Sequence, residues 1–170
     1  MTNYLKFTVV IILFLITSTS HSQLSKYNFE DYDFSSNESL EAIKEDVLSV
    51  ANLLLKEPVT KESKVRLDAG FFLNEWMKNT EDYSFGQGNL SHLYDEKEEL
   101  MIISMAAQVK YCLENGKNDS YEYESRLEIW KIMIQYIEEP KNKVKLTKNL
   151  KQLIKAKNEN QLANFLAENE

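Results

Sequence analysis

Residues 100–113 read Leu-Met-Ile-Ile-Ser-Met-Ala-Ala-Gln-Val-Lys-Tyr-Cys-Leu, and this stretch decides the fold. Eleven of its fourteen side chains are apolar, so apolar groups would occupy nearly every side of a helix with this sequence. A helix that is apolar all round lies in the middle of a bundle. The stretch is also too short to cross a bilayer, which takes about 20 apolar residues. We therefore predict a central helix over about 95–115, ended by Asn115-Gly116.

The sequence on both sides of this stretch predicts further helices. Apolar residues recur at helical spacing, no run of strict alternation indicates a strand, and Pro58 and Pro140 set helix ends. The predicted helices cover residues 37–57, 60–79, 119–139, 143–157 and 161–168. Gly70 falls inside the second of them, where we expect the close approach of a neighbouring helix. The predicted fold class is all-α, a single bundle of five to six helices over residues 37–170.

Residues 1–22 have the layout of a secretory signal peptide. Lys6 precedes an apolar run over residues 7–16, and Ser20 and Ser22 place small side chains before a cleavage at Gln23. The competing interpretation is an uncleaved membrane anchor, but a spanning helix needs about 20 apolar residues and this run has ten. We therefore expect a mature chain that is soluble and exported, either periplasmic or secreted.

Residues 23–36 form an aromatic segment with no helical pattern. Tyr27, Phe29, Tyr32 and Phe34 make two aromatic-x-aromatic pairs. The segment could lie across the helical domain in an extended form, or it could be a flexible tether. Burial of four aromatic side chains favours the docked form.

Charge is divided unevenly along the mature chain. Its 19 basic and 27 acidic residues give a net charge of −8, of which residues 141–170 carry +4 and residues 23–140 carry −12. An excess of acid excludes nucleic acid as a partner, because phosphate affinity comes from cations. Residues 141–157 hold seven lysines and no acid, and apolar side chains lie on one stripe. This predicted amphipathic helix either lies on an anionic membrane surface or packs its leucines on the bundle. The lysines that would contact a partner are Lys148, Lys151 and Lys155.

The residues that carry most catalytic and metal chemistry are scarce. His92 is the only histidine after residue 22, and Asp95 and Glu96 beside it do not make the ligand set of a zinc site. Cys112 is the only cysteine, so it forms no intramolecular disulfide, and we expect it to be buried. Paired carboxylates fall at predicted helix ends or in loops, where we expect them to be solvated, whereas general acid–base work needs one of a pair desolvated. We predict no catalytic residue, metal or cofactor, and a hydrolase using His92 is the least favoured function.

Residues 80–89 are the one loop with strong turn signals. Gly86 and Gly88 are expected to take positive φ, and the spacing is not that of a phosphate-binding loop. Tyr83 and Phe85 either fix this loop to the core or form an exposed aromatic surface for a partner. We therefore include both among the candidate binding residues.

A resemblance supports the helical fold. Residues 66–85, from Arg66 through Trp76 to Phe85, and residues 105–111 resemble an uncharacterised family of small exported helical proteins from bacteria. The resemblance covers about residues 40–140 and rests on aromatic and small residues. It implies an all-helical exported protein and no particular activity.

These observations lead to three functional hypotheses. The leading one is a non-enzymatic exported module that binds another exported protein. The second is a peripheral protein on an anionic membrane surface, using residues 141–157. The hydrolase comes third.

Overall fold

The computed structural model describes residues 23–58, 63–86, 88–94 and 97–169, and it confirms the all-α fold class. The α-helices of this part are α2 (Asn37–Ala42), α3 (Lys44–Lys56), α4 (Lys64–Asn79), α5 (Glu98–Asn115), α6 (Tyr123–Glu138), α7 (Lys148–Asn158) and α8 (Leu162–Glu168). The 3₁₀ helices are η1 (Gln23–Lys26), η2 (Phe29–Asp31), η3 (Gly88–Tyr94) and η4 (Pro140–Asn142). The predicted signal peptide, residues 1–22, lies outside the described residues.

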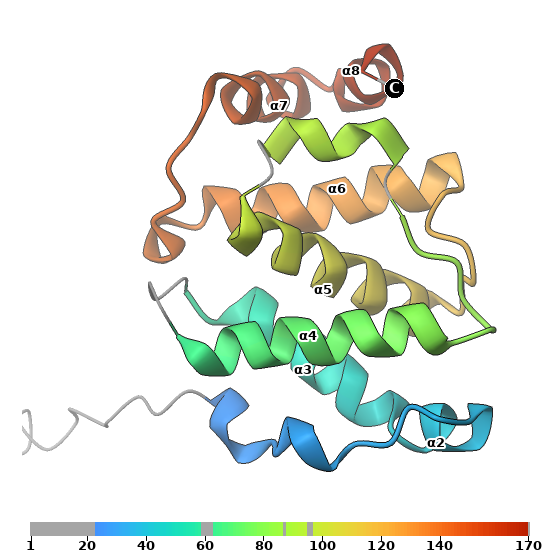
Figure 1. The fold of residues 1–170 in the computed structure, drawn as a ribbon. Coiled ribbons are helices and arrows are strands. Elements are labelled where there is room, and N and C mark those ends of the chain that lie inside the picture. The colour runs from blue at the N-terminus through green and yellow to red at the C-terminus, as the bar shows by residue number, and fades with distance from the viewer. Residues whose placement is uncertain (1–22, 59–62, 87, 95–96, 170) are drawn as a thin grey trace, which may run out of the picture.

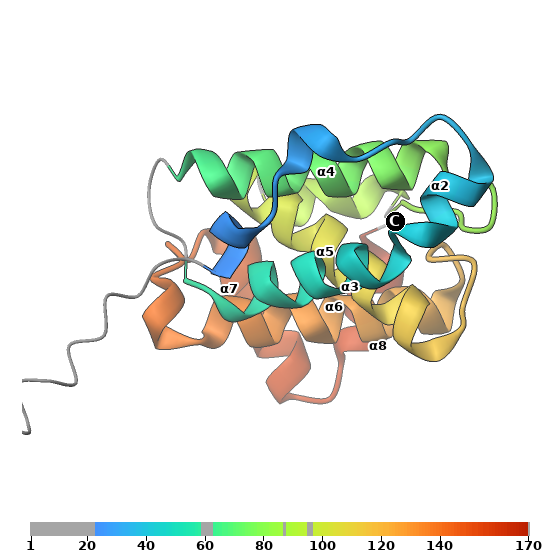
Figure 2. The same ribbon diagram turned by 90° about the horizontal axis from the view of Figure 1, so that it is seen from below.

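Helix α5 runs through the middle of the bundle, as the sequence predicts. It lies between α3 and α4 on one side and α6 on the other, and α7 and α8 form an outer layer beyond α6 (Figures 1 and 2). Ile102, Ala106 and Val109 join the core shared with α3 and α4. Leu100 and Ala107 join the core shared with α6, α7 and α8. The burial of α5 therefore links the two halves of the hydrophobic core.

The first predicted helix is divided in two by a break at Ile43. This residue has φ −96° and ψ 2°, which ends α2 and begins α3. The predicted N-terminus is confirmed, because the Ser36 hydroxyl accepts the Ser39 N–H at 3.1 Å.

The predicted start of the fourth helix at Asp119 is wrong. The Asp119 carboxylate accepts the N–H of Tyr121 at 2.8 Å, which makes a local turn in place of a helix cap. Helix α6 begins only at Tyr123.

The basic helix predicted over residues 141–157 is also shorter than expected. Lys143 has φ 51° after the turn of η4, so residues 143–147 are not helical. Thr147 caps the helix by accepting the Leu150 N–H, and α7 covers Lys148–Asn158.

Gly86 has a different role from the predicted one. Gly88 and Gly116 take positive φ, at 55° and 60°, but Gly86 does not. A Cβ atom at Gly86 would lie 2.0 Å from the hydroxyl oxygen of Tyr121, so the close packing of that ring explains the glycine.

The aromatic segment is docked on α4 (Figure 2). The rings of Phe29, Tyr32 and Phe34 surround Phe72, with centroid distances of 5.2, 4.6 and 5.8 Å. The Tyr32 hydroxyl also donates to the Asp46 carboxylate at 3.0 Å. This segment therefore extends the core of α3 and α4.

Gly70 allows α4 and α5 to approach each other, as predicted. A Cβ atom there would lie 2.8 Å from Cγ1 of Ile102. We expect Gly70→Ala to lower the free energy of unfolding by about 1–2 kcal/mol, because the strain of overpacking outweighs the gain in helix propensity. Urea denaturation measures this change.

The Ile102→Ala background supplies the control. The side chain that Gly70→Ala would strike is then absent, so the same substitution should be neutral or stabilising by up to about 1 kcal/mol. An equal loss in both backgrounds would contradict the packing of α4 on α5 at Gly70.

Candidate functional site

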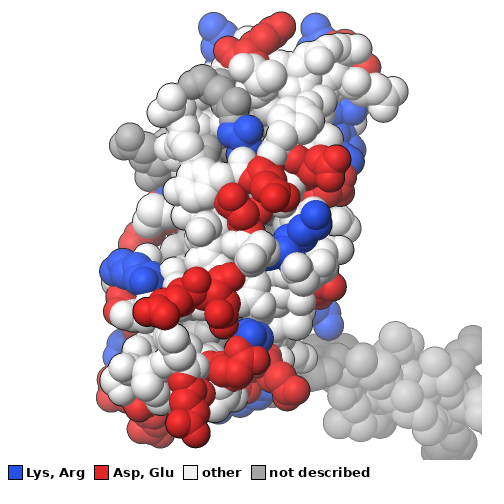
Figure 3. Space-filling view, turned by 90° about the vertical axis from the view of Figure 1, so that its right-hand side faces the viewer, with Lys and Arg blue, Asp and Glu red and all other residues white. Residues whose placement is uncertain are grey.

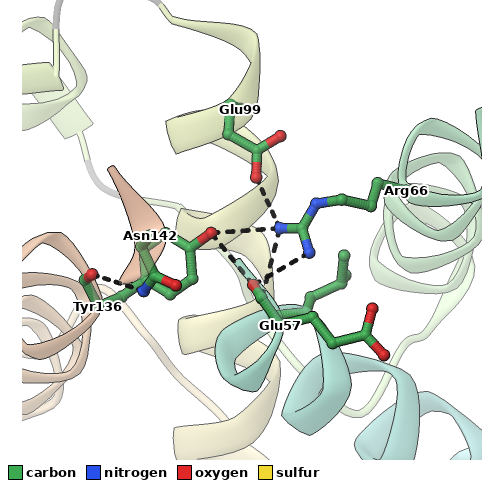
Figure 4. Close-up of polar contacts among 6 residues, drawn as sticks. Glu57, Arg66, Glu99, Tyr136 and Asn142 are labelled. Carbon is green, nitrogen blue, oxygen red and sulfur yellow. Dashed lines mark hydrogen bonds and ion pairs between the residues drawn. The ribbon is translucent and has the colours of Figure 1, made fainter. Parts of the chain in front are cut away.

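A buried arginine joins four helices where α4 and α5 begin and α3 and α6 end (Figure 4). Arg66 of α4 is 3% exposed, and its Nη2 donates to the Glu99 carboxylate of α5 at 2.6 Å. Nη2 also donates to the Tyr136 hydroxyl of α6 and to the Leu54 carbonyl of α3, each at 3.4 Å. Nη1 donates to the Glu57 carbonyl at 3.3 Å. The guanidinium therefore holds α3, α4, α5 and α6 together.

Each partner compensates part of the arginine's charge. The carbonyls of Leu54 and Glu57 lie at the C-terminus of α3, where the helix dipole is negative. Glu99 supplies a full negative charge and is 27% exposed, so the pair is only partly desolvated. Burial raises the pKa of Tyr136 to about 12, so its hydroxyl stays protonated and donates to the Glu57 carbonyl at 3.4 Å. The Nη1 and Nη2 groups of the planar guanidinium match this set better than one lysine ammonium would, while Nε has no partner in the described part of the chain.

Sequence reasoning missed Arg66 as a central residue. It lies on the apolar stripe of α4, three and seven residues before Ala69 and Leu73, which are both buried. It is also one of only two arginines in a chain that holds 18 lysines. The sequence does contain a signal for a buried arginine, because Arg66 falls on the apolar stripe of a predicted helix.

The helices that Arg66 joins present an apolar groove on their outer side. The groove lies between α4 and α5, has a volume of about 140 Å³, and is floored by Leu67, Gly70 and Ile102. Phe71 and Met101 border it and are 64% and 48% exposed. The prediction that α5 is buried on every side is therefore wrong at Met101, whose side chain is exposed.

A second hollow lies on the other side of Phe71. It has a volume of about 440 Å³ and is formed by α4 and the docked aromatic segment, with Tyr27, Phe29 and Phe34 in its lining. Phe71 borders both hollows, so its ring forms a ridge between them. We refer to Phe71, Met101 and these two hollows as the Phe71 surface.

Acidic side chains surround the Phe71 surface. Glu30, Asp68 and Glu75 line the larger hollow together with one lysine, Lys64. Glu98 lines the groove. Acidic side chains are also prominent on the face of the molecule that Figure 3 shows. The surface is therefore apolar with an anionic border.

Tyr83 and Phe85 lie elsewhere and are half-buried. Their rings pack on Trp76 at centroid distances of 5.6 and 5.8 Å. Between them, the backbone of Ser84 is hydrogen-bonded to Asn118 and Ser120. The structure therefore fixes this loop to the core, and a binding role for the two rings stays a prediction.

Lys148, Lys151 and Lys155 are exposed on α7, whereas Leu150 and Leu153 on its other face are fully buried in the bundle. Lys155 lies 3.8 Å from Glu159. Tyr83 and Phe85 pack against the core of α3 and α4, whereas Leu150 and Leu153 of α7 belong to the other part of the core, in the outer layer seen in Figure 1. The structure therefore does not bring the three lysines together with the two rings.

His92 lies at the surface, on η3. Its Nδ1 is 2.5 Å from the Asn89 carbonyl oxygen, and the neighbours Asp95 and Glu96 lie outside the described residues. Among the residues that the structure describes, no group of three or more His, Cys, Asp or Glu could hold a metal ion. Cys112 is fully buried, and desolvation raises the pKa of its thiol to about 12.

Comparisons with family models, curated proteins and solved structures found no match to this chain. None of the helices in the described ranges has the length and apolar character needed to cross a bilayer.

The importance of Arg66 can be tested by its removal. We expect Arg66→Met to lower the free energy of unfolding by about 3 kcal/mol, because it removes the arginine that donates to the Glu99 carboxylate and to the Leu54 carbonyl. Arg66→Lys should recover only part of this loss. Chemical denaturation measures both.

Lys131→Met is the matched control. Lys131 pairs with Glu128 at 2.6 Å on the surface, where both side chains are about half exposed. Its removal should cost less than about 1 kcal/mol. Equal losses for Arg66→Met and Lys131→Met would show that the buried cluster does not join the helices.

Proposed function

We propose that this chain is an exported, non-enzymatic interaction module that binds a basic, apolar segment of a partner protein at the Phe71 surface. The observation that carries the proposal is Phe71 itself, a large apolar side chain that is 64% exposed between two hollows. Export rests on the pattern of residues 1–22, and membership of the exported helical family rests on the resemblance over residues 40–140.

The placement of Phe71 supports binding over a role in folding. Its neighbour Phe72 is buried and packs against the aromatic segment, so the fold already uses the other side of α4. On α5, Met101 is likewise exposed while its neighbour Ile102 is buried in the core. Exposed apolar side chains that adjoin a groove and have a polar border are typical of protein interaction sites.

The acidic border selects the chemistry of the partner. Glu30, Asp68, Glu75 and Glu98 favour a segment whose apolar side chains are flanked by lysine or arginine. A second copy of this chain would bring two anionic borders together. Charge therefore favours a different protein as the occupant.

Synthetic peptides provide a direct test. A helical peptide with leucine on one face and flanking lysines should bind, whereas the same peptide with flanking glutamates should bind at least about tenfold more weakly. Phe71→Ser with Met101→Ser should weaken binding of the lysine peptide by a further factor of about ten or more. Fluorescence anisotropy of labelled peptides measures these affinities.

Tyr123→Ser is the control for the loss of an exposed ring. Tyr123 lies on α6 and is 49% exposed. This variant should bind the lysine peptide as the unaltered protein does. Binding that survives the double substitution, or that Tyr123→Ser weakens equally, would overturn the Phe71 surface as the site.

A second candidate function, contact with an anionic membrane, is favoured by the exposed lysines of α7. Helix α7 contains no acidic residue, and Lys148, Lys151 and Lys155 are all exposed. Because Leu150 and Leu153 are fully buried, the contact would be electrostatic, without insertion of the apolar face. Such adsorption is sensitive to salt.

Vesicle flotation separates this function from a general charge effect. Replacement of Lys148, Lys151 and Lys155 by glutamine should weaken binding to phosphatidylglycerol vesicles by about a hundredfold at low salt, at about 1 kcal/mol per lysine. The control replaces Lys78, Lys117 and Lys131 by glutamine. These three lysines lie outside α7, and their replacement changes the net charge of the protein by the same amount. Equal losses in both variants would rule out α7 as the contact.

A further inference from the structure

A hollow between α3, α5, α6 and η4 gathers basic groups in an otherwise acidic part of the chain. It has a volume of about 370 Å³, and its lining includes Lys56, Lys110 and Lys141 but only one acid, Glu139. Residues 23–140 as a whole carry −12. This hollow is separate from the Phe71 surface, since the two share no lining residue.

One lysine of the hollow is held in place and two extend from its border. Lys110 is 27% exposed, and its Nζ donates to Asn52 at 2.8 Å and to Glu114 at 2.5 Å. Lys56 and Lys141 are exposed, and within the described ranges neither has a carboxylate at ion-pair distance. Three lysines line the hollow against one acid, and Glu114 offsets part of the charge of Lys110, so the hollow keeps a net positive charge that favours an anion.

The remaining lining supplies neutral hydrogen-bonding groups. Tyr136 adjoins the hollow from α6, and its pKa of about 12 keeps the hydroxyl protonated. Asn142 also lines it and is 1% exposed, with its Nδ2 donating to the Tyr136 carbonyl at 2.8 Å. Its Oδ1 has no hydrogen-bond partner in the described part of the chain. Asn52 and Gln135 add side-chain amides.

We infer that this hollow binds a small anion with two or more negative charges, of the carboxylate or phosphate class. Three amino groups from separate elements suit several anionic oxygens better than one, and the side-chain amide nitrogens of Asn52 and Gln135 can donate to the same oxygens. A volume of about 370 Å³ accommodates a molecule of the size of citrate or inorganic phosphate. An apolar ligand would leave these donors without partners.

Isothermal titration calorimetry with citrate, succinate and inorganic phosphate tests the inference, with ionic strength held constant by sodium chloride. At least one of the three should bind saturably at one site. Lys56→Gln with Lys141→Gln should weaken that binding by about tenfold or more. Both lysines are exposed, so the variant should keep the stability of the unaltered protein. Preference among the probes identifies the carboxylate or the phosphate class.

Lys78→Gln with Lys131→Gln is the control of equal net charge. Both lysines are exposed on α4 and α6, outside the hollow, and this variant should bind as the unaltered protein does. The side-chain amide signals of Asn52 and Asn142 should shift on binding in ¹H–¹⁵N NMR spectra. Failure of all three probes to saturate, or equal weakening in both variants, would overturn the inference.

Discussion

The pairing of the Arg66 guanidinium constrains the rest of the structure. A buried positive charge is stable only where acceptors surround it, and here these come from the end of α3, from α5 and from α6. Apolar packing alone permits small shifts and rotations of one helix against another. The directional hydrogen bonds of Arg66 favour the observed arrangement of α3, α4, α5 and α6, in which Gly70 packs against Ile102.

Both candidate surfaces depend on this arrangement. The spacing of α4 and α5 sets the groove beside Phe71. The position of α6 against α3 and α5 forms the separate hollow that Lys56, Lys110 and Lys141 line. Tyr136 belongs to both the arginine cluster and the lining of that hollow. The inner faces of these helices pack in the core, so their exposed side chains contribute little to stability. The exposed side chains can therefore serve recognition.

The sequence predicts those features of the fold that depend on local periodicity. The apolar stripes, the central position of α5 and the close approach at Gly70 all follow from residues within one helix. The turn at Asp119 and the break at Lys143 were missed because side-chain hydrogen bonds and a left-handed residue competed with a good helical pattern. The lysine-lined hollow could not be predicted for another reason. Lys56, Lys110 and Lys141 are far apart in the sequence, and only the tertiary fold places them in one lining. Phe71 is different, because helical spacing places it opposite Ala69 and Leu73 on α4, so the sequence carried a signal of its exposure that the prediction did not use.

Native-state hydrogen exchange measures most directly whether α3, α4, α5 and α6 form one rigid unit. The slowest amides of all four helices should exchange with a single free energy of opening, equal to that of global unfolding. If the slowest amides of α4 exchange through an opening of clearly lower free energy than those of α5, the central role of Arg66 is contradicted.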